Sequence, residues 1–140
     1  MKMKKIILAF ILVGIVLISG CGQRGLTKKL NYYANEEIIN STLQDINYDV
    51  AGVDLIKNQN GFYVLSVAMD TKGNYDKEVL DAYKVMYENG VADYYQVAIV
   101  DYEMETSYSF VTTKKTLDDY FSGRIAEEEY LDQVEVKKLI

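Results

Sequence analysis

The 140-residue sequence contains no histidine, proline or tryptophan, and its only cysteine is Cys21. The lack of histidine excludes a Ser-His-Asp triad, a Cys-His pair and a histidine-based zinc site. No glycine-rich phosphate loop and no G-x-S-x-G turn is present either. A single cysteine cannot form an internal disulfide, so packing alone must hold the fold. We therefore expect no cofactor, no metal site and a protein that binds rather than catalyses.

Basic residues are also scarce. The chain has 15 basic and 21 acidic residues, which gives a net charge of −6. Residues 1–20 hold three lysines and no acidic residue, so the remainder carries a net charge of −9. Because nucleic-acid binding depends on lysine and arginine contacts to phosphates, a nucleic-acid partner is excluded. The remaining length suffices for one domain with its own core.

The first 20 residues have the layout of a secretory signal peptide. Lys2, Lys4 and Lys5 form a basic start, and an apolar run without any charge follows from Ile6 to Ile18. As a helix, this run measures about 20 Å, which is shorter than the bilayer core of about 30 Å. Its length matches the apolar region of a signal peptide that is later removed.

The residues that end this stretch, Ile18-Ser19-Gly20-Cys21, resemble the lipobox of prokaryotic lipoproteins. The family usually has leucine where this chain has Ile18. The resemblance implies that Cys21 receives a diacylglycerol, that residues 1–20 are cleaved, and that the protein is lipid-anchored at the extracytoplasmic face of the cell membrane. Residues 21–30 would then be a short basic tether, and 31–140 a single acidic domain. The alternative is an uncleaved N-terminal anchor helix that happens to contain a cysteine.

Hydrophobic periodicity predicts an α+β fold for residues 31–140. Ile39, Leu43 and Ile46 recur at helical spacing behind a possible cap at Asn35. Strands are expected at 48–56 and 62–69, joined by a turn at Asn60-Gly61, because both residues can adopt positive φ at low cost. In the second strand, alternation assigns one face to the core: Tyr63, Leu65, Val67 and Met69.

A second helix and a second hairpin follow. The helix is expected between a cap at Asn74 and a left-handed C-terminal residue at Gly90. Strands are expected at 94–102 and 108–113, and a capping box at Thr116 opens a short helix that ends at Ser122-Gly123. Residues 126–131 look helical, whereas 133–140 could be strand or helix. The predicted order is α-β-β-α-β-β-α-α, an antiparallel sheet of two hairpins separated by a helix, with the helices packed on one face.

Three groups of residues are candidates for a site. Asp101, Glu103 and Glu105 alternate and would share one face of a strand, as an acidic face or an acid/base pair. The tyrosines Tyr94, Tyr102 and Tyr108 are candidate anchors on the solvent face of the second hairpin. Asp70, Asn74 and Asp76 resemble a calcium loop only superficially, because Lys72 occupies a position that needs an oxygen ligand.

These features favour a membrane-tethered interaction module. Its partner would be a neighbouring envelope protein or a wall polymer, contacted through Tyr94, Tyr102 and Tyr108. The alternative is a small cell-wall glycan hydrolase that uses Asp101 with Glu103 or Glu105, which requires two carboxyl groups about 5 to 9.5 Å apart beside a cleft.

Overall fold

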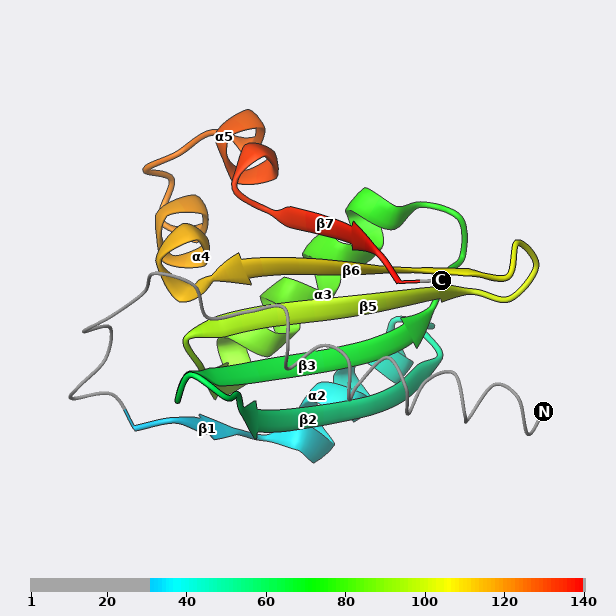
Figure 1. Ribbon diagram of the computed structural model, residues 1–140, viewed down its shortest axis with the longest axis horizontal. Helices are drawn as coiled ribbons and strands as arrows, with labels where there is room; N and C mark the ends of the chain where they lie inside the picture. Colours follow the sequence, from blue (N-terminus) through cyan, green and yellow to red (C-terminus); the bar gives the residue numbers. More distant parts are fainter. Residues whose placement is uncertain (1–30, 140) are drawn as a thin grey trace.

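The computed structural model describes residues 31–139, so Cys21, the predicted signal peptide 1–20 and the predicted tether 21–30 lie outside the described part. Residues 31–139 contain both helices and strands, which confirms the α+β class (Figure 1). The elements in chain order are β1 (Tyr33–Ala34), α2 (Glu36–Asp45), β2 (Val50–Lys57), β3 (Tyr63–Asp70), α3 (Tyr75–Asn89), β4 (Gly90–Val91), β5 (Tyr94–Asp101), β6 (Thr106–Thr113), α4 (Lys114–Phe121), α5 (Glu127–Asp132) and β7 (Glu135–Lys138).

The main sheet has five strands in the order β2-β3-β5-β6-β7. The hairpins β2–β3 and β5–β6 are antiparallel, as expected, and β7 adds antiparallel to β6. The two hairpins, however, meet through β3 and β5, which pair in parallel from Val64↔Tyr94 to Asp70↔Val100. The prediction of a purely antiparallel sheet is therefore wrong at its centre, because α3 carries the chain back to the start of the next strand. The predicted order also lacked β1 and β4, and β7 lies within residues 133–140, which the sequence left open as strand or helix.

The first hairpin turn is held by short-range hydrogen bonds, and the sequence predicted its position but not all of its details. The first hairpin lies where Asn60-Gly61 predicted it, and Gly61 has φ 85°. Asn58 organises this turn, since its Oδ1 accepts hydrogen bonds from the backbone N–H groups of Asn60 and Phe62 at 3.0 and 2.9 Å. Asn60 is not among the residues with positive φ, so Gly61 alone takes that conformation in this turn.

Helix ends give a mixed result. Asn74 caps α3 as predicted, accepting a hydrogen bond from the N–H of Lys77 at 3.3 Å. Gly90 is extended (φ −166°) rather than left-handed. A Cβ on Gly90 would lie 2.7 Å from Leu65 Cδ2 and 3.0 Å from the carbonyl oxygen of Tyr33, so glycine lets β4 approach β1. The cap of α4 is Thr113, not Thr116, because Thr113 accepts from the N–H of Thr116 at 3.1 Å.

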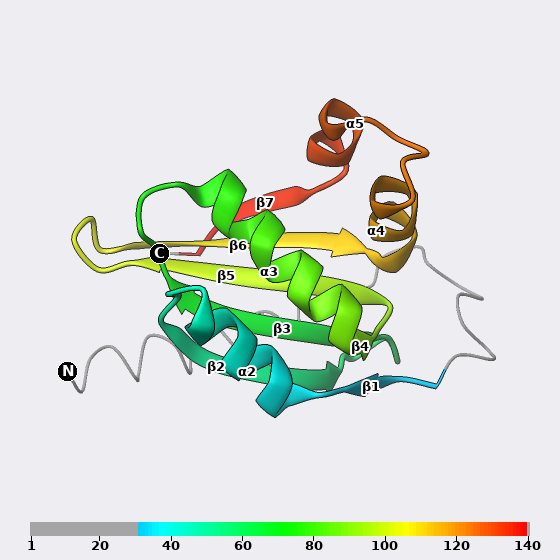
Figure 2. The same ribbon diagram turned by 180° about the vertical axis from the view of Figure 1, so that it is seen from behind.

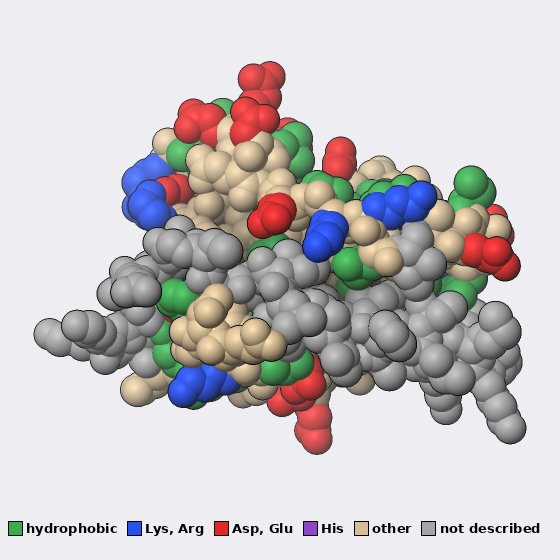
Figure 3. Space-filling model, in the orientation of Figure 1, with side chains coloured by type: hydrophobic (Ala, Val, Ile, Leu, Met, Phe, Trp, Pro, Cys, Tyr) green, Lys and Arg blue, Asp and Glu red, His purple; other side chains and the backbone are tan. Residues whose placement is uncertain are grey.

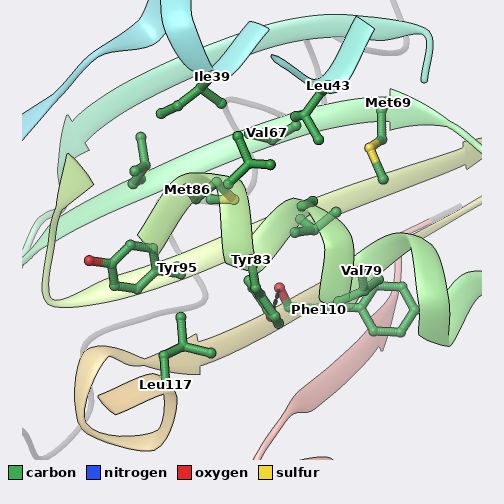
Figure 4. Packing of buried hydrophobic residues seen from close by; sticks show 14 of the residues in the cluster. Ile39, Leu43, Val67, Met69, Val79, Tyr83, Met86, Tyr95, Phe110 and Leu117 are labelled. Carbon is green, nitrogen blue, oxygen red and sulfur yellow. Dashed lines mark hydrogen bonds between the residues drawn. The ribbon is translucent and has the colours of Figure 1, made fainter. Parts of the chain in front are cut away.

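The main core lies between the sheet and its helices. Figure 2 shows α2 and α3 lying across one face of the sheet. Alternate residues of β3 point into this core, as predicted, and meet Ile39 and Leu43 from α2 (Figure 4). Tyr83 of α3 is fully buried and donates a hydrogen bond from its hydroxyl to the carbonyl oxygen of Phe110 at 2.7 Å.

The opposite side of the sheet, called here the second face, carries its own apolar cluster. No helix of residues 31–139 lies across this face (Figure 1). The cluster comprises Val64, Ala68, Tyr94, Ala98, Val100 and Val111, with Phe62, Tyr102 and Leu139 packed against it.

Tyrosine burial predicts how the fold responds to alkali. Burial raises the pKa of Tyr83 and Tyr95, and the hydrogen bond to Asp118 raises the pKa of Tyr87 to about 12, from 10.0 in an unfolded chain. Above pH 10.0 the unfolded chain loses protons that the folded chain retains. Stability should therefore be complete below that pH and fall steadily as the pH rises toward 12.

Circular dichroism and tyrosinate absorbance, recorded together through an alkaline titration, check this expectation. The absorbance of the buried tyrosines should appear together with the loss of helical signal. Ionisation of all 13 tyrosines while the circular dichroism is unchanged would contradict it.

Candidate functional site

The chain enters the domain at the N-terminal ends of the parallel strands β3 and β5. Asp93, just before β5, accepts hydrogen bonds from the Tyr32 hydroxyl at 2.7 Å and from the N–H of Tyr63 at 2.9 Å. The rings of Tyr32 and Tyr63 stack with centroids 4.3 Å apart. Burial and the hydrogen bond to Asp93 raise the pKa of Tyr32, so its hydroxyl remains a donor. This end of the sheet, called the proximal end, fixes where the N-terminal segment joins.

A pocket of about 410 Å³ lies at the other end, where β3 and β5 finish. Loops at the carboxyl ends of adjacent parallel strands converge, and ligand sites of open sheets form there. We call it the distal pocket, and it is lined by Asp70, Thr71, Lys72, Gly73, Val100, Asp101, Tyr102 and Glu103.

The buried side chain of Glu78 holds one wall of the distal pocket. Its two carboxylate oxygens accept hydrogen bonds from the Thr71 hydroxyl at 2.7 Å and from the N–H of Lys72 at 2.5 Å. Thr71 in turn accepts from the N–H of Gly73, which has φ 104°. A glycine is suited to this left-handed position, which lets the loop close over Glu78 before α3 begins.

The β5–β6 turn forms the other wall. Asp101 Oδ1 accepts a hydrogen bond from the N–H of Met104, and its Oδ2 accepts one from the Tyr75 hydroxyl, both at 3.1 Å. Glu105 has φ 51°, a left-handed conformation that closes the turn without glycine. Met104 at its tip is 70% exposed, and Figure 3 shows acidic side chains at this end of the molecule.

The structure separates the three predicted acidic residues. β5 ends at Asp101, and Glu103 and Glu105 lie in the turn, so the prediction that all three share a strand face is wrong. Asp101 and Glu103 line the distal pocket, whereas Glu105 does not.

The three candidate tyrosines do not share a face either. Tyr94 lies on the second face at the proximal end, where its ring meets Phe62 edge-on at 5.8 Å. Tyr102 packs beside the same face at the distal end and lines the pocket. Tyr108 points to the helix side, with its ring 5.5 Å from Tyr75. The expected surface of three neighbouring tyrosines is corrected to Tyr102 alone at the pocket.

The distal pocket is predominantly acidic. Asp70, Asp101 and Glu103 offer carboxylate oxygens, and Lys72 is its one basic side chain. Burial and then the charge of Asp70 raise the pKa of Tyr102, which keeps its hydroxyl protonated. Within residues 31–139, no group of three or more His, Cys, Asp or Glu side chains is placed to hold a metal ion. The arrangement therefore suits reversible contacts with basic or hydroxyl-bearing groups.

Sequence reasoning missed Asp70 and Lys72 as members of this site. Each strand of the parallel pair ends in an aspartate, Asp70 or Asp101, and that repetition was the available signal. This repetition did not indicate a site, because the predicted antiparallel sheet would have placed the two aspartates at opposite ends.

No protein family model, curated protein or solved structure matches this chain. In the described part, 31–139, no helix is long and apolar enough to cross a bilayer. The case for a function rests on the geometry of the site.

Replacing Glu78 tests how the pocket wall is held. Glu78→Ala removes both acceptors of the 71–73 loop and leaves a buried gap, so we expect a loss of about 1–3 kcal/mol in unfolding free energy. Amide hydrogen exchange at Lys72 and Gly73 should accelerate more than exchange in β5.

Lys77→Ala is the matched control on the same helix turn. The Lys77 side chain is exposed and forms a surface ion pair with Asp81, so its loss should change stability by less than about 0.5 kcal/mol. Equal exchange rates in Glu78→Ala and Lys77→Ala would show that Glu78 does not hold the loop.

Proposed function

We propose that this chain is a membrane-tethered extracytoplasmic lipoprotein that acts as a non-enzymatic binding module at the cell envelope. The observation that carries the proposal is the position of the distal pocket relative to the point where the chain enters. Tyr32 is hydrogen-bonded to Asp93 at the proximal end of the sheet, and the pocket lies at the far end of the same strands. Eight-residue strands separate the two ends by about 27 Å.

A tether at the proximal end places the distal pocket at the opposite end of the sheet from the membrane anchor. Residues 21–30 span at most about 35 Å when extended, so the domain stays close to the membrane that Cys21 would anchor. Two acyl chains on such a cysteine hold a protein stably on a bilayer. The acidic pocket then favours an envelope protein or wall polymer that presents basic or hydroxyl groups.

The alternative of a glycan hydrolase has weaker support. Both carboxylate oxygens of Asp101 already accept hydrogen bonds that shape the β5–β6 turn. Of its two suggested partners, only Glu103 reaches the pocket. We therefore propose binding, with the same residues in contact roles.

Lipidation can be tested with labelled palmitate. The wild-type protein should incorporate the label and lose residues 1–20, whereas Cys21→Ser should remain unlabelled and keep them, because serine has no thiol to receive the diacylglycerol. Ser19→Ala, which keeps a small residue before the cleavage site, should behave as wild type. A wild-type protein that retains residues 1–20 would instead support an uncleaved anchor helix.

Partner binding can be tested by crosslinking in cells, with mass spectrometry of the natively expressed protein. The double variant Tyr102→Ser/Glu103→Gln should lose at least about tenfold of the crosslinks to a partner, since each change removes a contact of the pocket. Thermal unfolding of the purified variant shows whether it still folds.

The control is Tyr33→Ser/Glu128→Gln, which makes the same changes at exposed positions outside the pocket. This control should crosslink as wild type does. A folded pocket variant with unchanged crosslinks would remove the distal pocket from the proposal.

A further inference from the structure

The strand β7 forms an open edge of the main sheet. Within residues 31–139, β7 pairs with β6 on one side and with no strand on the other, and its four side chains are exposed (Figure 1). Such an edge presents backbone groups to which another strand can add. At the opposite edge of the sheet, β2 contains a bulge between Val50 and Gly52, which discourages pairing, whereas β7 keeps a regular register along its whole length.

The pairing with β6 fixes which backbone groups of β7 point outward. The N–H of Leu139 donates to the carbonyl oxygen of Ser107 at 2.8 Å, which continues the register of the two strands. In an antiparallel pair, every second residue directs both its N–H and its C=O to the same neighbouring strand. The backbone groups of Glu135 and Lys137 are therefore directed to β6, and those of Val136 point away from the sheet.

The side chains of β7 carry opposite charges in a defined order. Glu135 and Lys137 are two residues apart and share one face of the sheet, and Val136 lies on the other face, where it is 56% exposed. A strand that adds to this edge must therefore place a positive charge opposite Glu135 and a negative charge opposite Lys137. The sequence of β7 itself, running in the reverse direction, has this order of charges.

We propose that two copies of this chain join their sheets edge to edge, with β7 antiparallel to β7 of the second copy about a two-fold axis that passes beside Val136. The outward N–H and C=O of Val136 then exchange two hydrogen bonds with Val136 of the second copy. Glu135 lies opposite Lys137 of the second copy, and Lys137 lies opposite its Glu135. The interface therefore contains two ion pairs on one face and two valine side chains in contact on the other.

The charges select this register among the alternatives. A slide by two residues places Glu135 opposite Glu135 of the second copy in one direction, or Lys137 opposite Lys137 in the other, and like charges directly opposite destabilise a strand pair. A slide by one residue would set the side chains of each copy against the wrong face of the other. Lysines on an edge strand also discourage unrelated strands from adding. The edge therefore suits a strand that brings a carboxylate to Lys137, as β7 of a second copy does.

The contact is short, so the dimer belongs to the class of weak interfaces, which confinement to one membrane would strengthen. The two-fold axis is perpendicular to the joined sheet, and the proximal ends of the two copies lie at its opposite ends. The placement on a membrane rests on the proposed function, whereas the pairing of the edges does not. Tethers of at most about 35 Å reach one membrane from both ends when the joined sheet lies along the membrane surface.

Disulfide trapping at Val136 tests the pairing and its register in cells that express the full chain. Directly opposite residues that exchange hydrogen bonds have Cα atoms about 5.5 Å apart, which a disulfide spans, so oxidised Val136→Cys should form a covalent dimer. Lys138→Cys is the matched control on the same edge and face. Its two copies lie four residues out of register, about 14 Å apart, and should yield at most about a tenth as much dimer. Wild type gives the background from Cys21.

Each outcome of this trapping decides the proposal. Equal amounts of dimer from Val136→Cys and Lys138→Cys would show random collision and overturn it. A Val136→Cys thiol that forms no dimer but reacts with a maleimide shows an open edge, and one that does not react shows another occupant; both overturn the pairing. A Val136→Cys dimer in protein that retains residues 1–20 or lies outside the membrane contradicts the proposed function and leaves the pairing standing.

Exchange of the charges gives an independent measurement. Glu135→Lys places lysines opposite each other in both pairs, so sedimentation of the full chain in detergent should show a dissociation constant raised about fivefold to tenfold. The double variant Glu135→Lys/Lys137→Glu restores both pairs with their signs exchanged and should return the constant to within about twofold of wild type. Both positions are exposed, so thermal unfolding should change little. A double variant that associates as weakly as Glu135→Lys would refute the pairing.

Discussion

The parallel pairing of β3 with β5 determines where everything else in this domain can lie. Because these two strands run in the same direction, the chain must return along the full length of the sheet, and α3 does so across one face. Their N-terminal ends then meet at Asp93, which binds Tyr32 and Tyr63, and their C-terminal ends meet at the distal pocket. The parallel pairing therefore places the point where the chain enters the domain one strand length away from the candidate site.

Sequence patterns predicted the structural features that depend on residues close together in the sequence. The spacing of Ile39 and Leu43 indicated a buried helix face, Asn74 indicated a cap, and alternation in β3 indicated which residues enter the core, because burial and capping act over one or two turns of chain. Gly90 was misread because its role is contact with Leu65 and Tyr33, which are distant in sequence. Strand direction, likewise, is a pairing between residues 30 apart, such as Val64 with Tyr94.

The sequence identified only part of the candidate site, for the same reason. Asp101, Glu103 and Glu105 were predicted to alternate along one strand, yet the chain turns directly after Asp101. Glu105 takes a left-handed conformation, which the sequence did not indicate because the turn contains no glycine. Asp70 joins them because parallel strands end at the same edge, and Glu78 shapes their loop from the first turn of α3. Because the site is assembled from two strand ends and a helix, the topology of the sheet brings its residues together. Their spacing in the sequence indicates only part of it.

The two faces of the sheet pose different physical problems. On the helix side, Tyr83 and Tyr95 bring hydroxyls into the core, and backbone groups within the domain satisfy them, at Phe110 for one and at Gly90 and Ala92 for the other. On the second face, Gln96 satisfies only one end of its amide within residues 31–139. A buried acceptor without a hydrogen bond costs free energy, so the two faces stabilise the domain differently although both are buried.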